Sequence, residues 1–150
     1  DVLEYFIKEN TTKIQHNLYK LSNSDSLYFL LCPDLMNISG EAIFKIYKKM
    51  DFNHLIILVD ELDLGFGEIK HKFSSENRGH NGIRSINNSF KCKYWQIIIG
   101  IDRPKDNLPI SDYVLSKISY IEREQIPVIA YKVGHILFNI IHQIKDGIVI

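Results

Sequence analysis

Two polar segments of this chain carry side chains suited to general-base chemistry and to holding a carbonyl group. In the first segment, Asp60, Glu61 and Asp63 come directly after the apolar run 55–59. A carboxylate held at the end of a strand can orient an imidazole and stabilise its charged form during general-base catalysis. The same spacing also suits an acidic loop in water, so these residues alone leave both roles open.

The second polar segment covers residues 74–82 and ends in Gly79-His80-Asn81-Gly82. Glycines beside His80 and Asn81 allow positive φ values and the close approach of a substrate. The amide of Asn81 can donate and accept at once, which suits holding a peptide carbonyl or an attacking water. The alternative is a turn that caps the next helix and leaves His80 in solvent. Taken alone, this motif is a weak signal.

A third polar point, Met36-Asn37-Ile38-Ser39-Gly40, also follows an apolar stretch. Asn37 lies at the entry to an expected helix, and on its sequence position alone it is a helix N-cap. Polar groups on short loops at strand ends are where α/β proteins place their chemistry, so this segment joins the other two as a candidate.

Composition limits the partners that such a site can have. The 150 residues are 45% hydrophobic and 24% charged, which is typical of one globular domain with a real core, here expected over 1–150. The formal net charge is 0, so RNA binding would require a local basic patch. Lys72, on the same strand face as Lys70, is one candidate for that patch, and a solvated strand face is its alternative. No metal-ligand spacing and no apolar run of about 20 residues occurs.

The hydrophobic pattern predicts alternating helices and strands along the chain. Helices are expected over 2–7, from Asn37 or Ser39 to 50, over 83–90, and after a capping box at Ser119 and Glu122. Strands are expected over 13–20, 26–32, 55–59, 67–73 and 95–101.

The strands 55–59 and 95–101 are uninterrupted apolar runs, which predicts central strands covered on both faces. The fold class expected from the whole pattern is α/β, with helices on both faces of a mixed sheet. In the last helix, seven apolar residues are expected to face inward: Val128, Val133, Ile136, Leu137, Ile140, Ile141 and Ile144. Pro127 should kink that helix or mark its effective start.

Together the segments around Asn37, Asp60 and His80-Asn81 resemble the bacterial-type peptidyl-tRNA hydrolase family, with the order of the motifs kept. That family cleaves the ester joining a peptide to the 3′ end of tRNA. The resemblance implies a three-layer α/β/α fold with a mostly parallel sheet, no metal or cofactor, and peptidyl-tRNA as the partner. It further implies a monomer without membrane association, in the cytoplasm or, as an alternative, in an organelle.

The resemblance also assigns site roles. Asp60 matches the aspartate that hydrogen-bonds the catalytic histidine, whereas His80 and Asn81 match residues that line the cleft. Asn37 matches an asparagine that contacts the peptide, and Met36 matches a methionine in the wall against which the peptide packs. Because parallel strands deliver their ends to one side of a sheet, Asn37, Asp60, His80 and Asn81 are expected to converge on one pocket.

The tRNA-binding positions depart from the family pattern. Lys72 matches a lysine that grips a tRNA phosphate, but the arginine that partners it in the family is replaced by Ile98. Arg103 is a nearby basic residue that could serve instead. The family normally has glycine where Asp102 stands, and its loop is richer in glycine where this chain reads Glu76-Asn77-Arg78.

The family's N-terminal strand and the catalytic histidine after it are not within these 150 residues. His16-Asn17 echoes that histidine segment but follows the first expected helix, so it is interpreted as a surface or strand histidine. Because the chain starts at Asp1, a domain truncated at its N-terminus is expected. The alternative is a relative that lost catalysis and kept the fold as an RNA- or ribonucleoprotein-binding module.

Overall fold

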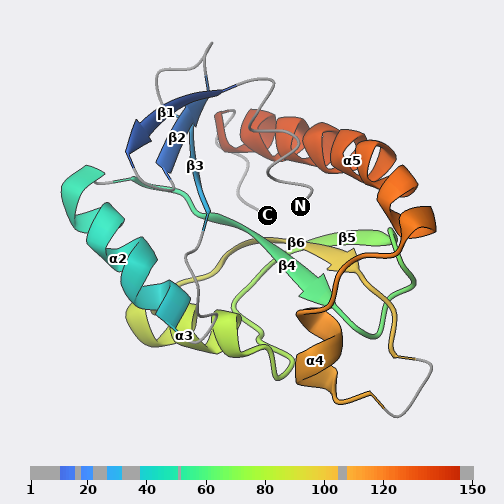
Figure 1. Cartoon of the computed structure of the whole chain (residues 1–150). Coiled ribbons are helices and arrows are strands. Elements are labelled where there is room, and N and C mark those ends of the chain that lie inside the picture. Colours follow the sequence, from blue (N-terminus) through green and yellow to red (C-terminus); the bar gives the residue numbers. More distant parts are fainter. Residues whose placement is uncertain are drawn as a thin grey trace. The chain divides into compact units, whose positions relative to one another are not determined.

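The computed structural model describes residues 11–15, 18–21, 27–31, 38–50, 52–104 and 108–145 (Figure 1). It divides into two compact units, and the chain passes between them repeatedly, so neither unit is one continuous segment. The described part of unit 1 is 57–72, 96–104 and 108–145, and the described remainder forms unit 2. The single domain expected over 1–150 stays a prediction, and the helix expected over 2–7 lies outside the described residues.

Unit 2 contains a three-stranded antiparallel sheet in the order β1-β2-β3, made of β1 (Thr11–Gln15), β2 (Leu18–Leu21) and β3 (Tyr28–Leu30). The prediction of one strand over 13–20 is wrong, because Gln15 pairs with Leu18 and the segment forms two strands. Alternating polarity continues through both strands, so the period alone does not reveal that the chain reverses between them. The strand expected over 26–32 is confirmed as the shorter β3.

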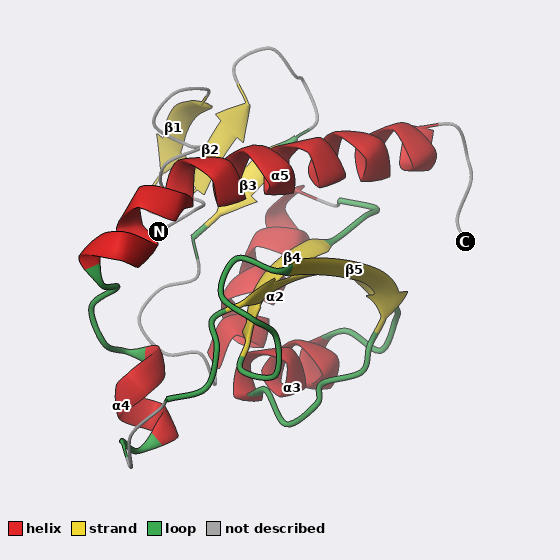
Figure 2. Ribbon diagram, turned by 90° about the vertical axis from the view of Figure 1, so that its right-hand side faces the viewer, coloured by secondary structure: helices red, strands yellow, loops and turns green. Residues whose placement is uncertain are grey.

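The helices α2 (Ser39–Met50) and α3 (Asn81–Ser89) pack against each other in unit 2, as Figures 1 and 2 show. Both helices were expected, and the buried residues Ile43, Ile83 and Ile86 lie on their apolar faces. The contact is close at Gly40, where an added Cβ would lie 2.1 Å from the backbone oxygen of Ser85. The Gly40 N–H also donates to Ser85 Oγ at 3.0 Å. Only glycine fits this crossing without displacing a backbone.

A second three-stranded sheet has the order β4-β6-β5 and consists of β4 (Ile56–Glu61), β6 (Tyr94–Gly100) and β5 (Ile69–Ser74). Trp95 N–H donates to Leu55 O, and Ile101 N–H donates to Glu61 O. The offset is 40 residues in both bonds (95 − 55 and 101 − 61), so β4 and β6 run parallel.

β5 runs against β6. Gly100, the last residue of β6, accepts from Gly67 N–H at 3.0 Å and donates to Glu68 O at 2.8 Å, just before β5 begins. The end of one strand therefore meets the start of the other, which is an antiparallel arrangement. The expected α/β class with a mixed sheet is confirmed.

The two apolar strands occupy different places in this sheet. β6 lies between its neighbours, which confirms the central position expected for 95–101. β4 stands at one end of the described order, so the central position expected for 55–59 is wrong within the described sheet. No residue of β4 is exposed, however. The apolar run correctly indicated that the faces of this strand are covered. It does not indicate the strand's position in the sheet, because strands pair through backbone groups, which hydropathy does not describe.

The helices α4 (Ile110–Val114) and α5 (Tyr120–Lys145) belong to unit 1. The capping box is confirmed, because Ser119 N–H donates to Glu122 Oε2 at 2.8 Å and Glu122 N–H donates to Ser119 Oγ at 3.3 Å. Pro127 lies inside α5 and therefore does not mark its start. The inward positions are confirmed by the burial of Val133, Leu137 and Ile140. The prediction is wrong for Val128, whose side chain is 55% exposed. Among the described residues, no helix is long and apolar enough to cross a bilayer.

Candidate active site

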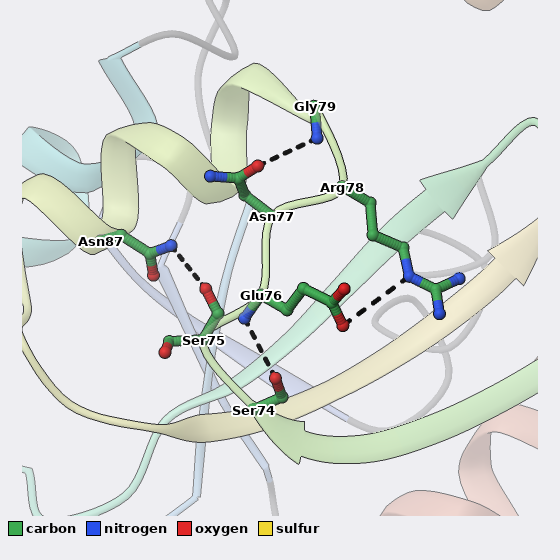
Figure 3. Close-up of polar contacts among 7 residues, drawn as sticks. All are labelled: Ser74, Ser75, Glu76, Asn77, Arg78, Gly79 and Asn87. Atoms are coloured by element: carbon green, nitrogen blue, oxygen red, sulfur yellow. Dashed lines mark hydrogen bonds and ion pairs between the residues drawn. The ribbon is translucent and has the colours of Figure 1, made fainter.

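The loop between β5 and α3, in unit 2, carries its own set of hydrogen bonds (Figure 3). The side chain of Asn77 accepts from Gly79 N–H at 2.9 Å, and the backbone oxygen of Asn77 accepts from His80 N–H at 2.7 Å. Gly79 has a φ of 85°, and the preceding Arg78 has a φ of 44°. Asparagine side chains commonly close such turns by bonding to the backbone two residues ahead. The loop is thus tightly folded directly before the His80-Asn81 pair.

His80 is the N-cap of α3. Its Nδ1 accepts from Ile83 N–H at 3.3 Å, which satisfies one of the helix's free amide groups. The alternative expectation of a turn that caps this helix is therefore confirmed, but His80 supplies the cap itself and is half-buried rather than left in solvent. Because Nδ1 must be unprotonated to accept, the neutral ring carries its proton on Nε2 and presents a donor there. Asn81 is the first residue of α3 and is exposed.

The carboxylates at the end of β4 lie in unit 1. Asp60 is within the last two residues of β4 and is half-buried, which confirms its expected place at the strand's C-terminal end. Glu61 Oε1 accepts from Asp63 N–H at 3.2 Å. Asp63 Oδ1 in turn accepts from Arg103 Nε at 2.7 Å and from Arg103 Nη2 at 2.6 Å. This ion pair is exposed and joins the loop after β4 to the loop after β6.

Those two loops also make close backbone contacts. An added Cβ at Gly100 would lie 2.1 Å from Gly65 O, so glycine is required where β6 passes the loop after β4. Asp102 N–H donates to Leu64 O at 3.0 Å, and Phe66 N–H approaches Asp102 Oδ2 at 3.4 Å. The φ of Asp102 is 62°, a left-handed conformation that aspartate adopts more readily than most residues.

The basic candidates are all on unit 1. Lys72 lies half-buried on β5, and the neighbouring Lys70 makes an exposed ion pair with Glu68 at 3.4 Å. Ile98 is 6% exposed on β6 and belongs to the core. The Arg103 side chain is 59% exposed beside Asp63. Its guanidinium is therefore accessible to solvent but already paired with a carboxylate.

The family model for peptidyl-tRNA hydrolase matches residues 2–147. This chain belongs to the peptidyl-tRNA hydrolase family. It is 36% identical over 127 residues to the peptidyl-tRNA hydrolase of Rickettsia typhi, a match covering 81% of this chain and 69% of that protein. It is 35% identical over 100 residues to the enzyme of Helicobacter hepaticus, covering 67% of this chain but only 44% of that protein.

A solved structure supports the fold. The crystal structure of peptidyl-tRNA hydrolase from Acinetobacter baumannii matches with a TM-score of 0.75 at 24% identity, covering 95% of this chain and 79% of that chain. At this identity the likeness is one of fold. The expected α/β fold of the peptidyl-tRNA hydrolase type is therefore confirmed.

Membership of the family gives the departures in sequence a physical meaning. Asp102, a position where the resemblance implies glycine, has a positive φ, a conformation that glycine adopts most readily. Arg78 also has a positive φ, in the loop where the family is richer in glycine. At position 98, where the resemblance implies a phosphate-binding arginine, this chain has a buried isoleucine.

The structure describes only some of the expected site residues. Met36 and Asn37 lie outside the described residues, as does His16. Asp60, Lys72 and Arg103 belong to unit 1, whereas His80 and Asn81 belong to unit 2. The convergence of these residues on one pocket stays a prediction. In the described part of the chain, no three His, Cys, Asp or Glu side chains form a group that could hold a metal ion.

Asn87 and Tyr94 hold the loop before α3 and were not predicted as site residues from the sequence. The side chain of Asn87 bonds both to Ser75 and to Tyr94. The signal was present, because Asn87 continues the apolar spacing of Ile83, Ile86 and Phe90 along α3. A polar residue on the inward stripe of a helix requires hydrogen-bond partners, since burying it without them is costly.

Proposed function

We propose that this chain hydrolyses the ester bond between peptide and tRNA in peptidyl-tRNA, recycling tRNA during translation. The observation that carries this proposal is membership of the peptidyl-tRNA hydrolase family over residues 2–147, together with the retention of Asp60 and the Gly79-His80-Asn81-Gly82 segment. Asp60 ends a strand, and Asn81 begins a helix. Both positions hold a polar group on a rigid element, as precise catalysis requires.

In this proposal Asp60 steers the histidine that the family carries on its N-terminal segment. That histidine removes a proton from water, and the water oxygen attacks the carbonyl carbon of the ester. The bond to the terminal ribose oxygen of tRNA then breaks, and the ribose oxygen takes up the proton. Asp60 stabilises the imidazolium formed in between, because a half-buried carboxylate interacts with a charged ring more strongly than an exposed one does.

Amide groups hold the reacting carbonyl in the proposed mechanism. Asn81, at the first position of α3, places its side chain near the positive end of the helix dipole, where a developing oxyanion is stabilised. His80 contributes a hydrogen-bond donor through Nε2 rather than a base, because Nδ1 already caps α3. Asn37 contacts the peptide, and Met36 packs against it.

The tRNA is bound by basic residues in this proposal. Lys72 and Arg103 bind phosphates of the acceptor end. The arginine that partners the lysine in the family does not take part, because Ile98 stands at its position. Because the substrate forms where ribosomes work, the proposed place of action is the cytoplasm, with an organelle as the alternative. The acting species is proposed to be a monomer.

The test is a release assay on labelled peptidyl-tRNA, with the protein expressed from its complete coding sequence. We expect turnover by the wild type and a loss of about 10²-fold or more in kcat for Asp60→Asn, because a misdirected general base typically costs that much. Asp63→Asn is the matched control, since it makes the same change in the exposed ion pair. Binding of tRNA without turnover, unaltered by Asp60→Asn, would instead establish an RNA-binding module.

A further inference from the structure

The side chain of Asn87 uses both ends of its amide. Tyr94 Oη donates to Asn87 Oδ1 at 2.7 Å, and Asn87 Nδ2 donates to the backbone oxygen of Ser75 at 2.6 Å. Figure 3 shows Asn87 reaching from α3 to Ser75 in the loop after β5. Tyr94 is a core residue, only 1% exposed, at the start of β6. The buried hydroxyl of Tyr94 thus holds the side-chain amide of Asn87, and that amide in turn holds Ser75 in the loop.

The loop is attached to α3 at both ends. Its first part is bonded through Ser75 to Asn87, and its last residue, His80, caps the helix through Ile83 N–H. Asn87 and Ile83 are four residues apart on α3, so the two attachment points lie one helical turn apart on neighbouring surface. Residues 75–80 therefore form a closed bridge over one side of the helix that begins with Asn81.

The orientation of the Asn87 amide is determined by its partners. The carbonyl of Ser75 can only accept, so the donor end of the amide must face it. Oδ1 then faces Tyr94, whose hydroxyl proton is directed to it. Rotating the amide by 180° would set two oxygens against each other at Ser75. The pair Tyr94–Asn87 can consequently hold the loop in one arrangement only.

This loop needs such a restraint. Arg78 is held at a φ of 44°, a left-handed conformation that is strained for a residue with a side chain. Strained positions of this kind persist only when surrounding contacts determine the backbone. The Glu76–Arg78 ion pair is exposed and 3.8 Å long, so it contributes little. The bond from Asn87 to Ser75, at 2.6 Å, and the cap made by His80, at 3.3 Å, are both shorter than this ion pair.

We propose that Asn87, held by Tyr94, is a positioning residue that fixes the His80-Asn81 pair for ester hydrolysis. The proposal rests on the proposed function and extends it to two residues that do not touch the substrate. A small displacement of a group that holds the reacting carbonyl reduces the rate of the chemical step more than it reduces substrate binding. Loss of the restraint should therefore lower kcat and leave KM nearly unchanged.

The first test compares Asn87→Asp with Asn88→Asp, in the protein expressed from its complete coding sequence. Both variants add one negative charge to α3, but Asn88 is exposed and only Asn87 bonds to Ser75. At position 87 the change removes the donor to Ser75 and keeps an acceptor for Tyr94. We expect kcat to fall about 3- to 10-fold for Asn87→Asp, the range of a single hydrogen bond, with KM within twofold. Asn88→Asp should match the wild type.

A second measurement reports the loop directly. Amide hydrogen exchange of Gly79 and His80 should be faster in Asn87→Asp than in Asn88→Asp, while exchange in β6 stays the same. Faster exchange throughout the protein would mean that Asn87 supports the fold in general, and would overturn the positioning role.

Tyr94→Phe keeps the ring in the core and removes only the hydroxyl, so it covers the case in which Asn87→Asp folds poorly. If Tyr94 acts through Asn87, the double variant Asn87→Asp/Tyr94→Phe should lose no more kcat than Asn87→Asp alone. Additive losses would overturn the proposal.

Equal kcat in Asn87→Asp and Asn88→Asp, with an active wild type, would overturn the positioning role and leave the proposed function standing. A wild type without turnover would overturn the proposed function and the positioning role with it, and exchange would then test only the loop restraint.

Discussion

The loop after β4 and the loop after β5 both carry candidate site residues, but different forces hold them. The loop after β4 is joined to the loop after β6 by the exposed Asp63–Arg103 ion pair and by the close passage of Gly100 past Gly65. The loop after β5 is held by neutral bonds from Asn77, His80 and Asn87. The first loop is therefore joined to its neighbour by charge and steric fit, whereas the bonds that close the second loop are neutral apart from the long Glu76–Arg78 pair.

This difference indicates which contacts stabilise each loop. Exposed ion pairs are worth about 0–1 kcal/mol and are screened by salt, so steric fit at Gly100 should dominate in the first loop. Neutral hydrogen bonds are insensitive to salt and depend on the donor and acceptor pattern. The same contrast suits the proposed roles, because Asp60 supplies charge and Asn81 supplies oriented dipoles.

The strongest test asks whether the two loops serve one reaction. Asp60→Asn and Asn81→Ala should each lower kcat by about 10²-fold if, as proposed, both groups stabilise the same transition state. The double variant should lose clearly less than the product of the two losses, since residues that act together are not additive. The measurement is a double-mutant cycle in the release assay. Fully additive losses would indicate that the two loops act independently.

Gly100→Ala should cause the largest loss of stability. The new methyl group would meet Gly65 O at 2.1 Å, so the backbone must shift, at a cost of about 3 kcal/mol. Gly65→Ala is the matched control, because its nearest neighbour would be a flexible Glu68 oxygen at 3.8 Å. Chemical denaturation of both variants measures the difference. Equal stability would show that the ion pair, and not the steric fit, holds this loop.

Tyr94 should make the protein sensitive to alkali. Burial, with a smaller contribution from Cys92, raises the pKa of Tyr94 from its ordinary 10.0 to about 12. Between these values the unfolded chain has released the phenol proton while the folded protein keeps it. The unfolded state binds fewer protons there, so the free energy of unfolding falls as pH rises from 10 to 12. Denaturation curves of Tyr94→Phe should lack this part of the fall, and curves parallel to the wild type would contradict it.

Arg78→Gly should be more stable than Arg78→Ala by about 1 kcal/mol. Both variants lose the exposed pair with Glu76, but only glycine adopts a φ of 44° without strain. Thermal unfolding of the two variants isolates the backbone effect from the lost charge. A more stable alanine variant would mean that the loop relaxes away from the left-handed conformation.

The smallest effect is expected for the ion pair itself. Arg103→Gln should lower stability by less than about 1 kcal/mol, because the side chains of Arg103 and Asp63 are 59% and 63% exposed. The difference from the wild type should shrink further in 1 M salt, where the Debye length is about 3 Å. Tyr94→Phe, measured alongside, should show no such salt dependence. A loss for Arg103→Gln that persists in high salt would contradict the division between charged and neutral loops.

Much of the fold was predictable because its signals are local. The capping box at Ser119, the helix from Ser39 and the buried strand ending at Gly100 follow from short-range spacing alone. The errors arose where one local pattern fits two structures. The alternation over 13–20 fits a single strand as well as the two strands of a hairpin, and the apolar run before Asp60 fits a strand at the end of a sheet. Hydropathy describes faces, whereas strand pairing is decided by backbone groups elsewhere in the chain.

The sequence by itself determined the family, the polar segments and the strands and helices that carry them, because spacing and motif order are properties of the chain. Only the tertiary structure decided the partners of those segments. Asn87 meets Ser75 across 12 residues, and Arg103 meets Asp63 across 40. It also decided that Gly100 admits no side chain. Such contacts depend on how distant segments pack, and no local pattern of residue types encodes a partner that far along the chain.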